Sequence, residues 1–203
     1  MSHIAQVFVE DLRFACGLKE LELFGYTVLP DHVHILFQPL GGSNCSEAVG
    51  SLKRNASRDI NDLLSGQPFV RNLSISPDAD PPTEEGDDSN RPLHLRRLLH
   101  SFHISKRRHP HLTFETYKSH FDRLESIRQT FEPDKAAAND LPYFRWQRSF
   151  RDHVIRDQRD FDNHIEYIYN NAVKHQLADS PHLWPWMWVV GMTSPLNHEG
   201  HKY

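Results

Sequence analysis

The sequence predicts a fold that combines several helices with a few short strands. Residues 4–23 place apolar side chains at the intervals of an amphipathic helix. Residues 25–39 contain two β-rich runs, and helical spacing returns over residues 158–172. The length of 203 residues and the hydrophobic fraction of 38% suit one globular domain, or one domain that carries an insertion.

The first helix is expected to end near Gly17 or a few residues later. Its apolar face is made of Val7, Phe8, Leu12, Ala15 and Leu18. Pro30-Asp31 then predicts a tight hairpin between two strands, because both residue types favour turns. Residues 46–64 look helical again, with Ser46 as the N-cap.

The second half of the chain alternates between irregular and helical patterns. Residues 66–90 are rich in Pro, Asp and Ser and read as a linker. The remaining elements are expected to be helices over 92–105 and 113–131, a strand from Phe150 to Ile155, and a last helix over 158–172. Asp157 is the predicted N-cap of that last helix, and the tail after Trp188 is expected to be loose.

These patterns predict three parts. They are a discontinuous domain of residues 1–66 and 141–190, an insertion over residues 67–140, and a tail over residues 191–203. Charge is segregated within the insertion: residues 76–88 hold six acids and no base, whereas residues 91–111 hold six Lys or Arg, five His and no acid. Such a basic stripe either serves a polyanion or solvates an exposed helix.

Composition excludes some classes of protein. No apolar stretch reaches the roughly 20 residues that span a bilayer, and no signal-peptide pattern is seen, so we expect a cytoplasmic protein without a membrane partner. Two cysteines, Cys16 and Cys45, cannot build a disulfide framework and are interpreted as buried thiols in a reducing compartment.

A pair of histidines marks the second strand of the hairpin. Because side chains alternate across a strand, Val33, Ile35 and Phe37 share one face. His32 and His34 lie together on the other face, where both can ligate one divalent ion. The spacing alone also fits chance, because the chain has 15 histidines and a second His-x-His at His109-Pro-His111.

Tyr167 and Asn171 are four residues apart in the last predicted helix and therefore share one face, with His164 one turn earlier. Phe161, Ile165, Ile168 and Ala172 form the neighbouring apolar stripe. A phenol oxygen can act as a nucleophile, and an amide oxygen can join two imidazoles on a metal. The alternative is an ordinary amphipathic helix with a solvated tyrosine and asparagine.

Four segments together resemble the REP-associated tyrosine transposases, which belong to the HUH endonucleases of single-stranded DNA with one catalytic tyrosine. The segments are GYTVLPDHVHILF, LKRNASRDIN, WQRSFRDHVIRD and DFDNHIEYIYNNAVKH. The resemblance implies an α+β fold with a small antiparallel sheet and packed helices. It also implies that His32, His34 and Asn171 are metal ligands and that Tyr167 is the nucleophile.

Family enzymes cut single-stranded DNA beside a hairpin and join its 5′ phosphate to the tyrosine. The expected cofactor is a divalent metal, Mg or Mn, because a phenol with a pKa near 10 needs a nearby cation to react at neutral pH. The expected partner is single-stranded or hairpin DNA, bound by a monomer or a homodimer. Candidate phosphate contacts are Lys53, Arg54, Arg148, Arg156 and Lys174, and Phe144 and Trp146 are candidates for base stacking.

Three features depart from the family pattern. The chain begins almost directly in the first helix, where family members usually have a strand, so the sheet is expected to lack one strand. Ala172 follows Asn171, where the family commonly has proline, and the insertion is longer than usual. Two other functions therefore stay open: a decayed or domesticated protein that only binds structured DNA, and a metal-dependent phosphodiesterase without a covalent intermediate.

Overall fold

The computed structural model describes residues 2–19, 21–40, 42, 44–66, 69, 93–131 and 143–192. The chain forms two compact units, one made of Met1–Leu52 and Trp146–Tyr203 and the other of Lys53–Arg145. In order, the elements are α1 (Ser2–Lys19), β1 (Leu21–Val28), β2 (Val33–Pro39), α2 (Cys45–Leu64), α3 (Leu93–Arg108), α4 (Phe114–Thr130), α5 (Gln158–Lys174), the short 3-10 helix η2 (Pro181–Leu183) and β3 (Met187–Val189). This is the expected α+β class. The linker predicted at 66–90 lies almost wholly outside the described residues, and the predicted tail at 191–203 lies largely outside them.

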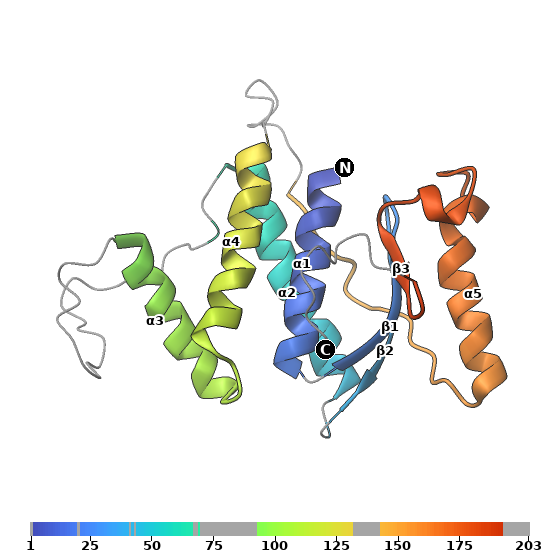
Figure 1. Ribbon diagram of the computed structural model, residues 1–203, viewed down its shortest axis with the longest axis horizontal. Coiled ribbons are helices and arrows are strands. Elements are labelled where there is room, and N and C mark those ends of the chain that lie inside the picture. Colours follow the sequence, from blue (N-terminus) through green and yellow to red (C-terminus); the bar gives the residue numbers. More distant parts are fainter. Residues whose placement is uncertain are drawn as a thin grey trace. The chain divides into compact units, whose positions relative to one another are not determined.

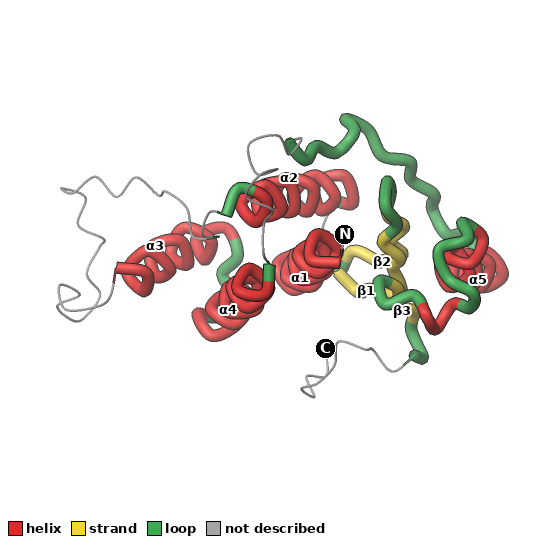
Figure 2. Tube along the Cα trace, turned by 90° about the horizontal axis from the view of Figure 1, so that it is seen from above, coloured by secondary structure: helices red, strands yellow, loops and turns green. Residues whose placement is uncertain are grey.

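The first unit is built around an antiparallel sheet with the strand order β2-β1-β3. Figure 2 shows this sheet between α1 on one side and α5 on the other. On the α1 side, Val7, Phe8, Leu12 and Ala15 are buried, which confirms the predicted apolar face of the first helix. The three layers leave both faces of the sheet covered by a helix.

The hairpin of β1 and β2 has the predicted turn at Pro30-Asp31, and Thr27 pairs with His34 across it. A β-bulge between Leu23 and Gly25 shifts the register. Gly25 lies opposite Val189 of β3, and a Cβ on Gly25 would come within 3.0 Å of the Val189 side chain. The third strand runs beside β1 (Figure 1), and glycine at position 25 leaves room for this close approach.

Helix α5 covers the other face of the sheet. Its Ile168 packs in a buried cluster with Leu36, Met187 and Val189. Phe161 meets Phe24 edge to face, with 5.2 Å between the ring centroids. The Asp157 side chain accepts a hydrogen bond from the backbone N–H of Asp160, which confirms the predicted N-cap.

Three local predictions were wrong. Residues from Phe150 to Ile155 form no strand, and the third strand is β3, which extends one residue past Trp188 into the tail that was expected to be loose. The N-cap of α2 is Asn44 and not Ser46, since the Asn44 side chain accepts hydrogen bonds from the N–H groups of Ser46 and Glu47. Cys16 is buried as expected, and burial raises its pKa to about 12, whereas Cys45 is only half-buried.

The second unit contains α3 and α4, which lie side by side (Figure 1) and contact each other through aromatic rings. The Phe102 ring lies 5.8 Å from that of Tyr117. Helix α4 begins at the N-cap Thr113, and it buries Tyr117, His120 and Leu124. No helix among the described residues is long and apolar enough to cross a membrane.

His120 makes the stability of this unit depend on pH. It is only 2% exposed, and its burial, with Arg123 and Arg58 nearby, lowers its pKa from 6.5 to about 3. Below pH 6.5 the unfolded chain therefore binds a proton at His120, whereas the folded chain binds this proton only below about pH 3. The contribution of His120 to the free energy of unfolding is therefore complete above pH 6.5 and falls as the pH drops from 6.5 to about 3.

We therefore expect the free energy of unfolding to fall by about 2 kcal/mol between pH 7 and pH 5 on account of His120 alone. Urea unfolding at both pH values should show this loss in the parent protein and a smaller one in His120→Gln. The control is His103→Gln, which removes an exposed histidine of the same unit. An equal pH dependence in the parent and in His120→Gln would contradict the assignment.

Candidate metal and tyrosine site

The two histidines of the hairpin lie side by side at the start of β2. Their ring centroids are 4.9 Å apart, and the planes are nearly perpendicular. The Nδ1 atom of His32 lies 2.7 Å from the Asp31 carboxylate, which holds the pKa of Asp31 below its usual value. A hydrogen bond at Nδ1 fixes the ring and leaves its Nε2 atom as the available ligand atom.

His34 is set deeper in the molecule. Its Nε2 atom is buried and has no hydrogen-bond partner among the described residues. Burial, together with the nearby His32, His175 and Lys174, lowers the pKa of His34 from 6.5 to about 4. The ring is therefore neutral at physiological pH, which is the form that ligates a metal.

Tyr167 comes to this pair from α5. Its ring lies against that of His34, with 5.0 Å between the centroids, and the residue is 40% exposed. The Nζ atom of Lys174 lies 5.0 Å from the centre of the same ring. The predicted apolar stripe of α5 packs on the sheet, and this packing fixes which face of the helix turns toward the histidines.

Asn171 is fully buried on the same face of α5. Neither its Oδ1 nor its Nδ2 atom has a hydrogen-bond partner among the described residues. It lies midway between Tyr167, which meets His34, and His175, whose ring is 5.4 Å from that of His32. A buried amide without partners costs free energy, and it requires an explanation.

These side chains fit a divalent cation by their chemistry. His34 Nε2 and the Asn171 side chain are buried polar groups without partners, and both are neutral donors. Imidazole nitrogen and amide oxygen together accept several divalent metals, so this donor set does not select one ion. The sequence singled out His32, His34, Asn171 and Tyr167, and the structure places Tyr167 and Asn171 on the face of α5 that meets the two histidines.

His175 is the residue that the sequence analysis missed. It follows Asn171 by four residues, as Asn171 follows Tyr167, so extending the same spacing by one step would have found it. It is the C-cap residue of α5, and its N–H donates to the Asn171 carbonyl. The ring contact with His32 therefore depends on where the helix ends.

The predicted phosphate contacts lie in different parts of the molecule. Arg148 and Arg156 are exposed on the segment that precedes α5, and Lys174 lies over the Tyr167 ring. Lys53 and Arg54 belong to the second unit, on α2. Of the two aromatic candidates, Trp146 packs against Phe8 at 5.5 Å, and Phe144 is half-buried with its backbone N–H donating to Asn61.

Comparison with known proteins gives a family match over part of the chain. Residues 2–68 match the family model of IS200-like transposases, a span that includes His32 and His34 and stops before α5. The first part of the chain is therefore related to these transposases.

Two relatives that the chain matches carry the name REP-associated tyrosine transposase. The chain is 49% identical over 41 residues to a putative REP-associated tyrosine transposase of Haemophilus influenzae, which is 20% of this chain and 23% of that protein. It is 42% identical over 40 residues to the REP-associated tyrosine transposase of Escherichia coli, which is 20% and 24% of the two chains. The resemblance seen in the sequence motifs is thus confirmed. The alignments span about a quarter of these relatives, and no solved structure matches the chain.

Replacing the buried amide of Asn171 by an apolar group should change the stability of the protein. In the presence of EDTA, Asn171→Leu should raise the free energy of unfolding by about 1 kcal/mol or more, because leucine has a similar size and no polar atoms to desolvate. Urea unfolding measures the change. Asn170→Leu, on the exposed side of α5, is the matched control and should change little. A loss of stability in Asn171→Leu would show that the amide has partners of its own.

Proposed function

We propose that this protein is a metal-dependent tyrosine transposase, or nickase, that cleaves and rejoins single-stranded DNA at hairpin sequences. The observation that carries the proposal is the position of Tyr167, Asn171 and His175 on one face of α5, against His32 and His34. The match to IS200-like transposases supports a transposase-type role, and the names of the relatives support the tyrosine chemistry.

In this proposal His32, His34 and Asn171 hold one divalent ion, Mg or Mn. Bound there, the ion would offset the negative charge of a phosphodiester, because three neutral ligands leave its double charge undiminished. Buried His34 stays neutral and ready to bind, and Asn171 gains a partner for its carbonyl oxygen. The hydrogen bond between His32 and Asp31 keeps the first ring oriented.

Tyr167 is the proposed nucleophile. Its phenol oxygen forms a bond to the phosphorus while the bond from phosphorus to the 3′ oxygen breaks; the phenol loses a proton, and the leaving oxygen gains one. The Lys174 ammonium group places positive charge beside the phenol where negative charge develops. The energy of the ester bond is conserved in the phosphotyrosine. A 3′ hydroxyl can therefore attack it later and rejoin the strand without an external energy source.

The arrangement favours a site completed by one subunit. Tyr167 meets His34 of its own chain, so no second copy is needed to bring the phenol to the histidine pair. Arg148 and Arg156 precede the tyrosine helix with exposed side chains, and they are the proposed contacts to the phosphates of a bound strand. Lys53 and Arg54, in the second unit, are proposed as further phosphate contacts.

Structured-DNA binding without cleavage is the second candidate function. It is favoured by the last turn of α3, where the exposed Lys106, Arg107 and Arg108 end a basic helix. Such a protein would bind hairpin DNA with an affinity that falls steeply as salt rises, and it would form no covalent product. A metal-dependent phosphodiesterase would instead release a product without any adduct.

The first test is the covalent adduct. Labelled single-stranded DNA that contains the hairpins flanking the gene should yield, with Mn²⁺, a protein–DNA band that survives denaturing electrophoresis. Tyr167→Phe should abolish it, because phenylalanine has no oxygen to attack. Tyr169→Phe is the matched control, since Tyr169 packs against the core cluster, and its band should persist. An adduct in Tyr167→Phe would refute the nucleophile.

The second test is metal dependence. EDTA should abolish the adduct, and added Mn²⁺ or Mg²⁺ should restore it. His34→Ala and Asn171→Ala should each lower the adduct rate by roughly a hundredfold or more, because each removes a ligand that positions the charge. Hairpin binding in EDTA, measured by gel shift, should stay within about twofold. An adduct of full yield in EDTA would contradict the proposed metal chemistry.

A further inference from the structure

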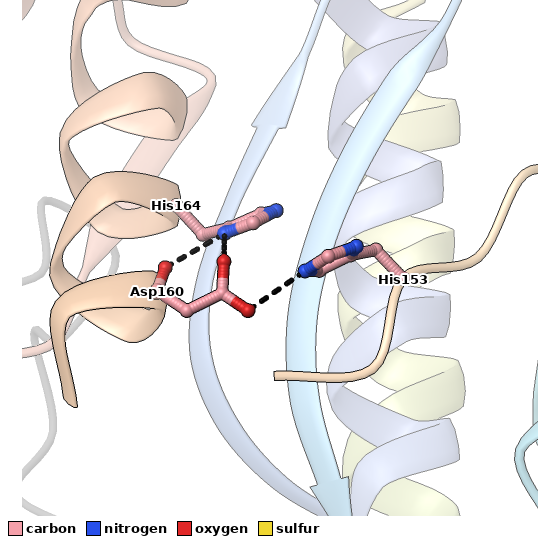
Figure 3. A group of neighbouring side chains, drawn as sticks. All are labelled: His153, Asp160 and His164. Carbon is pink, nitrogen blue, oxygen red and sulfur yellow. Dashed lines mark hydrogen bonds and ion pairs between the residues drawn. The ribbon is translucent and has the colours of Figure 1, made fainter. Parts of the chain in front are cut away.

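A second group of potential metal ligands lies on α5, apart from the two histidines of the hairpin. His153, Asp160 and His164 each present one ligand atom, and these atoms lie within 4.8 Å of one another. Figure 3 shows each imidazole turning one nitrogen toward Asp160. The His153 Nε2 atom is 2.9 Å from Asp160 Oδ2, and His164 Nδ1 is 2.7 Å from the Asp160 backbone carbonyl oxygen and 3.3 Å from Oδ1.

The group joins α5 to the segment that precedes it. Asp160 and His164 are one turn apart at the start of α5, so the helix itself sets their spacing. His153 comes from residues 146–157, which have no regular secondary structure. This segment turns back on α5, where the backbone N–H of Arg156 also donates to Asp160 Oδ2 at 3.2 Å.

The chemistry of the three groups suits a cation better than a simple ion pair. The hydrogen bond from His153, with those from Arg156, lowers the pKa of Asp160 to about 2, so the carboxylate is ionised throughout the physiological range. The two imidazoles stack with 4.6 Å between centroids and 15° between planes. Two imidazoles and one carboxylate form a set of three ligands that binds Zn²⁺ and other first-row metals and leaves a position for water.

We propose that His153, Asp160 and His164 bind a divalent transition metal, with Zn²⁺ as the best match. The ion replaces the protons that the imidazole nitrogens now share with Asp160, and it takes His153 Nε2, His164 Nδ1 and one carboxylate oxygen. The Arg156 guanidinium, 3.3 Å from the same carboxylate, has an exposed side chain and can move into solvent. The bound metal ties the segment 146–157 to the tyrosine helix.

This site is separate from the one that contains Tyr167. His164 and Asn171 are seven residues apart, so their Cα atoms lie about 10 Å apart along the helix axis. One ion cannot be shared between ligands on both turns at metal-ligand distances near 2 Å. The inference stands on its own geometry, and it does not depend on the tyrosine reaction.

The test uses Co²⁺ as a spectroscopic probe of the full chain, in the double variant His32→Ala/His34→Ala, which lacks the hairpin histidines. This background should bind one equivalent of Co²⁺ with visible d–d bands. Adding His153→Ala should weaken the binding by about tenfold or more and should remove the bands. Adding His182→Ala, an exposed histidine whose Nε2 lies 3.3 Å from the Ser180 hydroxyl, is the control and should change neither.

Hydrogen exchange supplies a readout that metal binding elsewhere would not change. Zn²⁺ should slow backbone exchange over residues 150–156 in the background variant and leave it unchanged when His153→Ala is added. Circular dichroism checks that each variant folds. The proposal is overturned if Co²⁺ binding survives His153→Ala, if it is lost only in His109→Ala/His111→Ala, or if the background binds no Co²⁺ at millimolar concentration.

Discussion

The packing of α5 on the sheet is the contact on which the candidate site depends. Ile168 and its apolar neighbours lie against Leu36, Met187 and Val189, and this fixes the rotation of the helix about its own axis. Each residue of a helix turns by about 100°, so the buried stripe also decides which side chains lie beside it. Tyr167 and Asn171 reach the histidine pair because Ile168 and Ala172 are buried next to them.

The electrostatics of the site follow from the same packing. Covering the sheet with α5 takes His34 and Asn171 out of water without giving either side chain a partner. A protein retains such groups at a cost in stability, and a cation that both groups coordinate can offset that cost. Burial first, and then the neighbouring His32, His175 and Lys174, lower the pKa of His34 so that its ring stays neutral, while Tyr167 remains accessible.

The sequence predicted the elements whose signals are local. The hairpin has Pro30-Asp31 at its turn, the last helix has Asp157 as its N-cap, and both apolar helix faces show the helical period. It failed where the cause lies elsewhere in the chain. The strand Met187–Val189 has only three residues, and it exists because Gly25 lets a backbone approach β1 closely. Conversely, the run from Phe150 to Ile155 alternates like a strand but finds no partner strand, and His153 is held by Asp160 instead.

The replacement of the family's proline by Ala172 has a structural consequence for the site. Proline at this position has no N–H to donate within the helix, and its ring would clash with the carbonyl of Ile168 one turn earlier. Alanine avoids both effects, so α5 continues to Lys174 and ends with the His175 N–H bonded to the Asn171 carbonyl. That extra turn carries the His175 ring to 5.4 Å from His32. In this chain, which departs from the family pattern at Ala172, a third imidazole therefore lies beside the histidine pair.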